Sequence, residues 1–407
     1  MSRSEGGHRL PELLVLASTY PRWLGDHEPG FVHELAKRLT RDFAVTVLCP
    51  HSTDTQTEEW MEGVRVIRYR YAPVRWETLV NDGGIVTNLR RSRWKLLLVP
   101  GFVLAQAWTA FRLVRRQHFD VLHAHWLIPQ GLIAVLLRWL PGRPIPFIVT
   151  SHGADLFALK GAALGVVKRL VVRQAAAVTV VSGAMVGALE TIGADVKKVQ
   201  VQPMGVDLSE RFTPDQDVER SKDEILFVGR LVEKKGLRHL IDAMPAILDG
   251  HPSAFLTVAG FGPEEKERRA HVQRLGLEKK VSFLGAVTQK ELPKLYRRAA
   301  MFVAPFVEAE SGDREGLGLV SIEAAGCGCP VVCSDLPQVR EAFGSESGAH
   351  FTQPGSSTSL AAACLDIFRA PDYSLHLAAQ MREGLMGTFD WKARAGAYGT
   401  LLRRLVP

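Results

Sequence analysis

Two cationic side chains lie at a predicted junction between a strand and a helix, where an anion could bind. An apolar run from Ile225 to Val228 leads into the loop 229–236, which contains Arg230 and Lys235 and has a glycine at each end. Glycine lets the backbone approach a ligand closely, and the free N–H groups at the start of a helix attract phosphate. Arg and Lys would add charge-assisted contacts. The loop predicts a diphosphate site; the alternative is a basic loop without a ligand.

Two glutamates flank a second glycine-containing loop. Glu315 precedes the loop, and Glu323 falls in the apolar run that follows it. The free N–H groups at the start of a helix here would hold a phosphate. Because Glu is seldom buried without a partner, Glu323 requires one, and either a ligand diol or an internal salt bridge would serve. One carboxylate could bind the hydroxyls of a sugar and the other those of a ribose.

A histidine follows another predicted strand. His152 comes directly after the apolar run from Phe147 to Ser151, and Asp155 follows three residues later. A group at the carboxyl end of a parallel strand is well placed for an active site. A single histidine in such a place can equally be structural, and Asp155 can equally cap the next helix.

Short apolar strands alternate with helical periodicity along the whole chain. This rhythm predicts an α/β fold in which helices cover parallel sheets. It is interrupted between Pro203 and Glu224 by prolines and a polar, acidic stretch, and it then restarts. We therefore expect two Rossmann-like, doubly wound domains that face each other across a cleft. The predicted strands cover residues 13–17, 44–49, 120–123, 147–151, 177–181, 225–228, 255–259, 281–284, 301–304 and 331–333.

Composition excludes several classes of protein. The chain has 407 residues, of which 46% are hydrophobic and 23% charged, so it can bury large cores and is neither disordered nor fibrous. Its 5 cysteines have no metal-ligand spacing and favour a reducing compartment. The first apolar run, Leu13 to Ala17, predicts a core strand and not a signal peptide. The longest apolar stretch, Leu96 to Phe111, is interrupted by Pro100 and Gly101, so no spanning helix is expected.

The net charge of +7 is distributed unevenly. Residues 65–116 contain 11 Lys and Arg against 2 Asp and Glu, and Trp76, Trp94 and Trp108 lie among them. A basic, aromatic, amphipathic segment is typical of contact with an anionic membrane surface. The alternatives are an ordinary solvated face and a nucleic-acid surface. No recognition-helix, zinc-finger or RNP pattern supports nucleic acid as the partner.

The segment from Glu315 to Glu323 resembles the E-x7-E signature of the retaining glycosyltransferases of family 4, which have the GT-B fold. Further motifs in the family's order extend the resemblance over nearly the whole chain, from Tyr20-Pro21-Arg22 to the helix near Trp391. They are His152-Gly153-Ala154-Asp155, Gly205-Val206-Asp207, Val228-Gly229-Arg230-Leu231 with Lys235-Gly236, Gly260-Phe261-Gly262-Pro263 and Phe283-Leu284-Gly285.

The resemblance implies a role for each matching residue. Arg230 and Lys235 would hold the diphosphate, Glu323 the ribose, and Glu315 the donor sugar. The catalytic group would be His152, Glu315 and Asp155, with His152 against the donor sugar and Asp155 orienting its surroundings or shaping the acceptor pocket. The backbone of Gly316, Leu317, Gly318 and Leu319 would also contact the donor, and Gly30 would lie beside the phosphates.

The resemblance also implies that the chain divides into two domains and a C-terminal helix. Residues 1–205 would form the acceptor-binding domain, residues 206–385 the nucleotide-sugar-binding domain, and residues 386–407 a C-terminal helix that packs back on the first.

This chain departs from the family's pattern in three places. Gly25 and Gly30 are separated where relatives often have a glycine pair, Met204 replaces a frequent asparagine, and residues 308–314 form a charged insert before Glu315.

We therefore expect a retaining enzyme that transfers a sugar from a UDP- or GDP-sugar to a membrane-proximal, lipid-linked or other glycan acceptor. No acidic DxD motif stands at a matching position, so no metal cofactor is expected. The enzyme is expected in the cytoplasm, on the inner face of the membrane. The alternatives are a GT-B nucleotide-sugar epimerase, a transferase with a soluble acceptor, and a binder of nucleotide sugars without activity.

Overall fold

The computed structural model describes residues 9–26, 30–81, 84–140, 144–157, 159, 161–315, 317–344 and 348–406. The chain forms two compact units. Unit 1 comprises Met1–Met204 and Arg394–Pro407, and unit 2 comprises Gly205–Ala393. The chain thus enters unit 2 one residue before the expected boundary, and it returns to unit 1 at Arg394 and not at residue 386.

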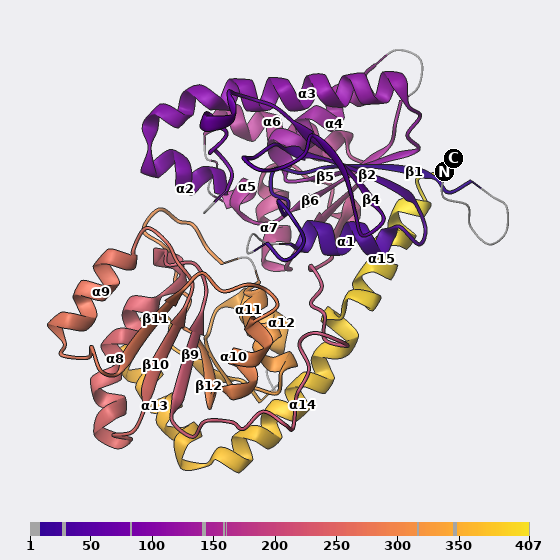
Figure 1. The fold of residues 1–407 in the computed structure, drawn as a ribbon. Coiled ribbons are helices and arrows are strands. Elements are labelled where there is room, and N and C mark those ends of the chain that lie inside the picture. Colours follow the sequence, from indigo (N-terminus) through magenta and orange to yellow (C-terminus); the bar gives the residue numbers. More distant parts are fainter. Residues whose placement is uncertain are drawn as a thin grey trace. The chain divides into compact units, whose positions relative to one another are not determined.

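Unit 1 is built on an eight-stranded sheet with the order β3-β4-β2-β1-β5-β6-β7-β8 (Figure 1). All neighbouring strands are parallel except β3 and β4. The strands are β1 (Glu12–Leu16), β2 (Ala44–Pro50), β3 (Glu58–Met61), β4 (Val64–Tyr69), β5 (Val121–His125), β6 (Phe147–Ser151), β7 (Ala177–Val180) and β8 (Val199–Val201).

Helices cover this sheet, as the alternating pattern predicts. The helices are α1 (Phe31–Leu39), α2 (Gly84–Arg91), α3 (Leu98–Arg116), α4 (Leu132–Arg138), α5 (Ala154–Phe157), α6 (Ala162–Gln174) and α7 (Ala184–Thr191), followed at the C-terminus by most of α15 (Trp391–Arg403). In Figure 1, α3, α4 and α6 lie on one side of the sheet and α1 on the other. Phe102 and Ala110 of α3 are buried and turn its inner side towards the unit's core.

Unit 2 has a six-stranded parallel sheet with the order β11-β10-β9-β12-β13-β14. Its strands are β9 (Glu224–Val228), β10 (Phe255–Ala259), β11 (Val281–Gly285), β12 (Met301–Ala304), β13 (Val331–Ser334) and β14 (His350–Thr352). Its helices are α8 (Leu237–Gly250), α9 (Glu265–Arg274), α10 (Leu292–Arg298), α11 (Leu319–Gly326), α12 (Pro337–Phe343), α13 (Ser357–Arg369) and α14 (Pro371–Phe389).

The core of unit 2 lies on both faces of its sheet. Along β9, Ile225 and Phe227 enter the core shared with α8 and α13, whereas Leu226 and Val228 enter the core shared with α10 and α11. This alternation follows from the two-residue period of a strand, and a strand that is buried on both sides needs apolar residues at every position. The continuous apolar run in the sequence is therefore what a central parallel strand requires.

The predicted α/β class is confirmed, and the ten predicted strands occur within one or two residues of their expected ends. The prediction missed β3, β4, β8 and β14. Strand β3 is antiparallel, lies at the edge of the sheet and consists of Glu58, Glu59, Trp60 and Met61, so it lacks the apolar run of a central strand. All five cysteines are buried and free, and they pack as small core residues.

The sequence predicted no helix long enough to span a membrane, and this prediction is wrong about the length of the helix. Residues Arg93–Arg116 form a continuous helical segment of 24 residues that is long and apolar enough to cross a bilayer, and 22% of its most apolar window is buried. Pro100 does not break it because Pro100 lies in the first turn of α3, where a backbone N–H has no partner within the helix.

In both sheets the order in which the chain adds strands reverses next to a central strand. Strand β1 lies between β2 and β5, and strand β9 lies between β10 and β12. At such a switch point the connections from the two adjacent strands run to opposite sides of the sheet, and ligands bind beyond the carboxyl ends of the strands. The loops after β9 and β12 contain Arg230, Lys235 and Glu315, and those after β5 and β6 contain the surroundings of His152.

The loops at the switch point of unit 2 pack so closely that Gly260 cannot carry a side chain. Its φ is +140°, and a Cβ atom would lie 1.9 Å from the carbonyl oxygen of Gly229. We expect Gly260→Ala to destabilise unit 2 by about 2 kcal/mol or more, because the two loops must separate. Hydrogen exchange of the β9 and β10 amides measures this loss.

Gly387→Ala is the control, since Gly387 is helical in α14 and has no atom within 4 Å of a Cβ position. It should stabilise unit 2 by up to about 1 kcal/mol. Equal protection of the β9 and β10 amides in both variants would show that the loops have room for a Cβ at Gly260.

Candidate functional site

The loop after β9 brings Lys235 to the switch point of unit 2. Residues Glu233–Lys235 form a single turn of 3₁₀ helix, and Gly236 ends it in the left-handed conformation, with a φ of +69°. A Cβ on Gly236 would lie 1.7 Å from the carbonyl oxygen of Pro305, so glycine is required for the two loops to meet. Arg230 lies half-buried in the same loop.

Lys235 forms an ion pair with Glu315. Lys235 Nζ lies 2.9 Å from Glu315 Oε2 and 4.8 Å from the centre of the Phe306 ring. Burial alone would raise the pKa of the Glu315 carboxyl, but the nearby charges of Lys235 and Lys234 and the N–H of Gly318 outweigh burial and lower the pKa to about 2. Lys235, which is predicted to bind the diphosphate, is therefore in direct contact with Glu315, which is predicted to bind the sugar.

The charged insert packs on the same loop. Lys234 Nζ lies 3.2 Å from an oxygen of Asp313, and the N–H of Glu310 donates to Glu233 over 2.8 Å. Arg314 pairs with Glu308 within the insert at 2.7 Å. Residues 308–314 thus hold the chain next to Glu315 and fix the loop 233–235.

The helix α11 begins at Leu319, directly after Gly318. Gly318 has a φ of +73°, and a Cβ there would lie 2.6 Å from the Phe306 ring. Leu317 is buried, and Leu319 packs against the core of the unit. The predicted loop opening into a buried helix is confirmed, although Gly316 lies outside the described residues.

Glu323 is buried in α11 and accepts a hydrogen bond from the hydroxyl of Tyr296, at 3.0 Å. Only 8% of Glu323 is exposed. Burial raises the pKa of its carboxyl to about 7, against the lowering effects of Tyr296, Arg211 and Lys235. The partner that the sequence required is therefore a tyrosine hydroxyl in this structure. Tyr296 was missed because a tyrosine in an apolar helix has no distinguishing pattern.

In unit 1, Asp155 holds the loops after β5 and β6 together. It is 2% exposed and accepts hydrogen bonds from the N–H of Leu127 at 2.7 Å, the hydroxyl of Ser151 at 2.9 Å and the N–H of His152 at 3.2 Å. These contacts hold the backbone next to His152 in place, and the roles expected for Asp155 in the reaction stay predictions. The contacts use both carboxylate oxygens within the loops.

Aromatic rings surround His152. Its ring centre lies 4.8 Å from that of Phe31, 4.9 Å from that of Trp126 and 5.2 Å from that of His125. Burial lowers the pKa of His152 to about 3, so the ring is neutral at physiological pH. His125 was missed, although its place at the end of β5, next to β6, could have identified it.

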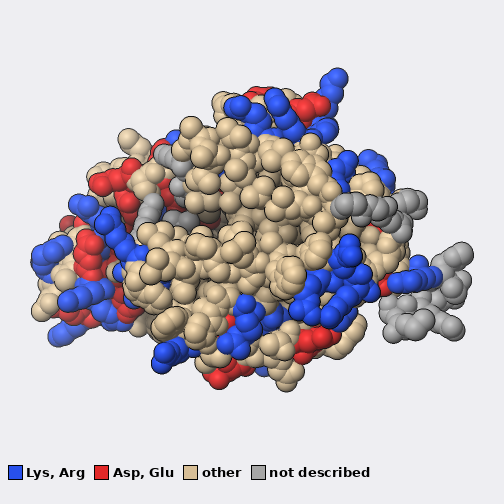
Figure 2. Space-filling model, turned by 90° about the horizontal axis from the view of Figure 1, so that it is seen from above, with Lys and Arg blue, Asp and Glu red and all other residues tan. Residues whose placement is uncertain are grey.

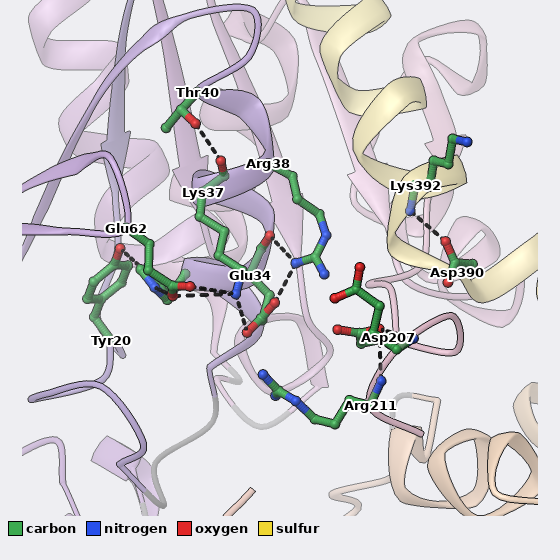
Figure 3. Close-up of polar contacts among 12 residues, drawn as sticks. Tyr20, Glu34, Lys37, Arg38, Thr40, Glu62, Asp207, Arg211, Asp390 and Lys392 are labelled. Atoms are coloured by element: carbon green, nitrogen blue, oxygen red, sulfur yellow. Dashed lines mark hydrogen bonds and ion pairs between the residues drawn. The ribbon is translucent and has the colours of Figure 1, made fainter. Parts of the chain in front are cut away.

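Gly30 directly precedes α1, where Phe31 begins the helix. Its φ is −86°, and the nearest atom to a Cβ there is on Pro21 at 3.8 Å, so the backbone does not require glycine. A network beyond it fixes α1 (Figure 3). It runs from Tyr20 through His33 to Glu62, with bonds of 2.6 and 2.8 Å, and Lys37 joins Glu62 at 3.2 Å.

The basic segment of unit 1 divides into an inner and an outer part. Arg68 is 3% exposed and pairs with Glu59 at 2.8 Å. Arg65 and Arg70 also have partners, at Glu58 and Glu77. A glutamate therefore balances the charge of each of these three arginines, although 44% of the Arg70 side chain is exposed. Arg91, Arg93, Arg112, Arg115 and Arg116 are exposed.

The outer side of α3 exposes large apolar side chains. Leu97 just before it is 81% exposed, and Leu104 and Trp108 within it are 68% and 60% exposed. Further exposed apolar residues of unit 1 are Trp76, Trp94, Leu96, Leu136 and Trp139. Figure 2 shows a broad area without charged side chains over α3, with Lys and Arg at its border. Such a patch is typical of an interaction surface.

The buried carboxyl of Glu323 should make stability depend on pH. Between pH 4.5 and 7 the unfolded chain releases this proton first, so the free energy of unfolding falls as pH rises through that window and then stays constant. The full effect is about 3 kcal/mol at about 1.4 kcal/mol per pKa unit. Glu323→Gln should remove it, so urea denaturation should show a gain over the parent that grows from pH 4.5 to 7.

Glu383→Gln, at an exposed position of α14, is the matched control and should follow the parent at each pH. If Glu323→Gln also follows the parent, the Glu323 carboxyl is ionised throughout, and the burial argument is wrong.

Both halves of the chain match families of glycosyltransferases. Residues 31–210 match Glycosyltransferase Family 4, and residues 209–384 match Glycosyl transferases group 1. The glycogen synthase of Mycobacterium tuberculosis is 28% identical over 95% of this chain and 92% of its own. The D-inositol 3-phosphate glycosyltransferase of Frankia alni is 30% identical over 68% of this chain and 72% of its own.

Solved structures show the same fold. Sucrose-phosphate synthase from Thermosynechococcus elongatus superposes with a TM-score of 0.77 at 23% identity, covering 98% of this chain and 99% of that one. HepE of Anabaena, solved in complex with UDP and glucose, superposes with a TM-score of 0.71 at 18% identity, covering 97% and 100%. The resemblance seen in the sequence is thus confirmed: the chain belongs to glycosyltransferase family 4 and is a nucleotide-sugar-dependent glycosyltransferase with the GT-B fold.

Proposed function

We propose that this enzyme transfers a sugar, with retention of configuration, from a UDP- or GDP-sugar to a lipid-linked glycan acceptor at the inner face of the cytoplasmic membrane. The observation that carries the membrane part is the exposed apolar side of α3 with its border of arginines. The donor part rests on Lys235 at the switch point of unit 2, paired with Glu315.

The donor's diphosphate would bind Arg230, Lys235 and the N-terminus of α11. These cations and N–H groups stabilise the negative charge that develops on the departing phosphate as the bond between the sugar and the diphosphate breaks. No metal cofactor is proposed, because the two cationic side chains supply this charge. HepE, solved with UDP and with UDP-glucose, and a starch synthase solved with ADP support a nucleotide donor.

The sugar would lie against Glu315 and His152, and the ribose against Glu323. A neutral His152 can donate or accept a hydrogen bond at a sugar hydroxyl without adding charge. A positive charge spreads over the ring oxygen and C1 of the sugar in the transition state, and the carboxylate of Glu315 would stabilise it. We propose that the acceptor attacks from the face that the leaving group occupies.

The membrane would bind the outer side of α3. An amphipathic helix that lies in the interface buries apolar and aromatic side chains among the lipids and places Arg at the headgroups. Leu97, Leu104 and Trp108 supply the apolar part, and Arg112, Arg115 and Arg116 the basic part. A relative from Mycobacterium leprae, 29% identical over 62% of this chain, is named phosphatidyl-myo-inositol mannosyltransferase, which supports a lipid acceptor.

A donor screen tests the proposed reaction. Thermal shift with UDP-, GDP- and ADP-sugars identifies the nucleotide, and turnover is then measured with lipid-linked and soluble glycan acceptors. A new nucleotide sugar formed without any acceptor would instead identify an epimerase. Binding of donors without turnover on any acceptor would identify a nucleotide-sugar binder.

Calorimetry with UDP or GDP separates the roles of the site residues. Lys235→Ala should weaken binding by about tenfold or more, because a charge-assisted contact is lost. Glu323→Gln should also weaken binding, since ribose is part of the nucleoside diphosphate. Glu315→Gln should leave it unchanged or strengthen it, because Lys235 loses a competing anion.

Arg238→Ala is the control for Lys235, because Arg238 lies in the helix that follows the loop but is exposed and pairs with Asp242. It should bind the nucleotide as the parent does. Equal losses for Glu315→Gln and Glu323→Gln would mean that the sugar and ribose ends are misplaced.

Co-sedimentation with vesicles tests the membrane surface. Binding should require anionic lipid and fall at high salt, because the Debye length shrinks from about 10 Å at 0.1 M to about 3 Å at 1 M. Changing Arg112, Arg115 and Arg116 to Ser should reduce the salt-dependent part, to which Arg91 and Arg93 also contribute. Changing Leu97, Leu104 and Trp108 to Ser should abolish the part that salt does not remove.

Arg238, Arg274 and Lys279, exposed in unit 2, provide a charge-matched control when changed to Ser, and this variant should bind like the parent. Binding to neutral and anionic vesicles alike, or to neither, would contradict the electrostatic membrane surface. A soluble acceptor, as in the name of the Frankia relative, would then be the better proposal.

A further inference from the structure

A second histidine contacts His152 directly. His125 is the last residue of β5, and it lies in register with Thr150 of β6, two residues before His152. His125 Nδ1 lies 2.9 Å from His152 Nε2, and the two rings are nearly parallel, 13° apart. A hydrogen bond between the two rings fixes the orientation of both.

The contact also links the protonation of the two rings. Burial lowers the pKa of His125 well below its usual value and that of His152 to about 3, so both rings are neutral. In a neutral imidazole one nitrogen carries the proton and the other accepts. Of the two facing nitrogens, one must carry a proton and the other must not. The tautomer of His125 therefore sets the tautomer of His152.

His125 is itself held by a rigid layer. It is 1% exposed, and its ring lies 4.1 Å from that of His123. His123 Nε2 bonds the hydroxyl of Thr150 at 2.7 Å, and Thr150 bonds the hydroxyl of Thr179 at 2.6 Å. The His123 ring also stacks on Tyr398 of α15, 5.5 Å away. Three strands and a helix thus fix the side chain that contacts His152.

The residue after His125 is strained. Trp126 has a φ of +77°, which a bulky side chain rarely adopts. Its N–H is bonded to the carbonyl of Thr150 at 2.7 Å, and its ring packs against His152. Strained backbone of this kind persists only where the surroundings over-determine it, and it gathers at functional sites. Here the strained backbone places the Trp126 ring against His152, next to the contact with His125.

We propose that His125 is a positioning residue, which holds His152 in one orientation and one tautomer for the transfer reaction. This inference rests on the proposed function, in which His152 contacts the donor sugar. With Nε2 of His152 engaged by His125, Nδ1 of His152 is left for the substrate. His125 acts through His152 and needs no contact of its own with the donor.

Three substitutions of His125 test this role. The amide of Asn can take the place of the Nδ1 nitrogen and bond to His152, whereas the amide of Gln reaches the place of Nε2, and Leu offers no polar atom. We expect His125→Leu and His125→Gln to lower kcat by about tenfold or more, with KM for the donor unchanged. His125→Asn should recover most of the activity.

The reaction measured is release of nucleoside diphosphate from UDP-glucose, GDP-mannose or ADP-glucose, whichever stabilises the full chain. Circular dichroism and the thermal midpoint of each variant check the fold. If kcat is the same in the Leu, Gln and Asn variants as in the parent, or if Asn is no better than Gln, the positioning role is wrong.

Nuclear magnetic resonance gives a readout without turnover. With ¹⁵N-labelled histidine and His152→Gln for assignment, the ring nitrogens of His152 should show one tautomer in the parent and in His125→Asn, and a mixture in His125→Leu. One tautomer in all three would overturn the inference and leave the proposed function standing. Full activity of His152→Gln would instead overturn the placing of His152 at the donor and, with it, the purpose of the contact.

Discussion

The close approach of the strand-end loops in unit 2 is the constraint on which the rest of the site depends. Gly236 and Gly260 lie where a Cβ would collide with the backbone of a neighbouring loop, and Gly318 where it would collide with the Phe306 ring. Only because these positions lack side chains can the loops after β9, β10 and β12 meet. Their meeting places Lys235 against Glu315. The glycines that let the loops approach therefore also determine where the charges of Lys235 and Glu315 lie.

Burial has opposite outcomes for the two glutamates of unit 2 because their partners differ. Glu315 and Glu323 are both removed from water, yet the pKa of Glu315 falls to about 2 and that of Glu323 rises to about 7. Glu315 has two lysines close by, whereas the hydrogen-bond partner of Glu323 is a neutral hydroxyl. His152, half-buried among aromatic rings, has its pKa lowered by the loss of hydration and is neutral. Charge is retained only where an opposite charge repays the loss of hydration.

The sequence predicted most of the fold because apolar runs and helical periodicity are local signals. The ends of β9 and β6, and the start of α11, were found from a few residues each. What the sequence could not predict is contact between segments far apart along the chain. Tyr296 reaches Glu323 from a preceding helix, and His125 reaches His152 from a neighbouring strand. The position of His125 just after a predicted strand could have marked it as a candidate, but only the fold reveals either contact.

The basic segment shows how the same kind of residue takes different roles in one stretch of chain. Arg68 has an acidic neighbour across β3 and β4 and is buried with it, whereas Arg112, Arg115 and Arg116 at the end of α3 are exposed. Net charge over residues 65–116 therefore overstates the charge that a partner would meet.

Helix α3 exposes apolar side chains as well as arginines. A helix that is apolar on its inner side needs no Leu or Trp on its outer side to pack on a sheet. Phe102 and Ala110 already supply the inner contacts, so Leu104 and Trp108 are not needed for folding. Exposed apolar area of this kind costs free energy in water, at about 25 cal/mol per Å². A surface that keeps it in this place is best explained by a partner that removes it from water.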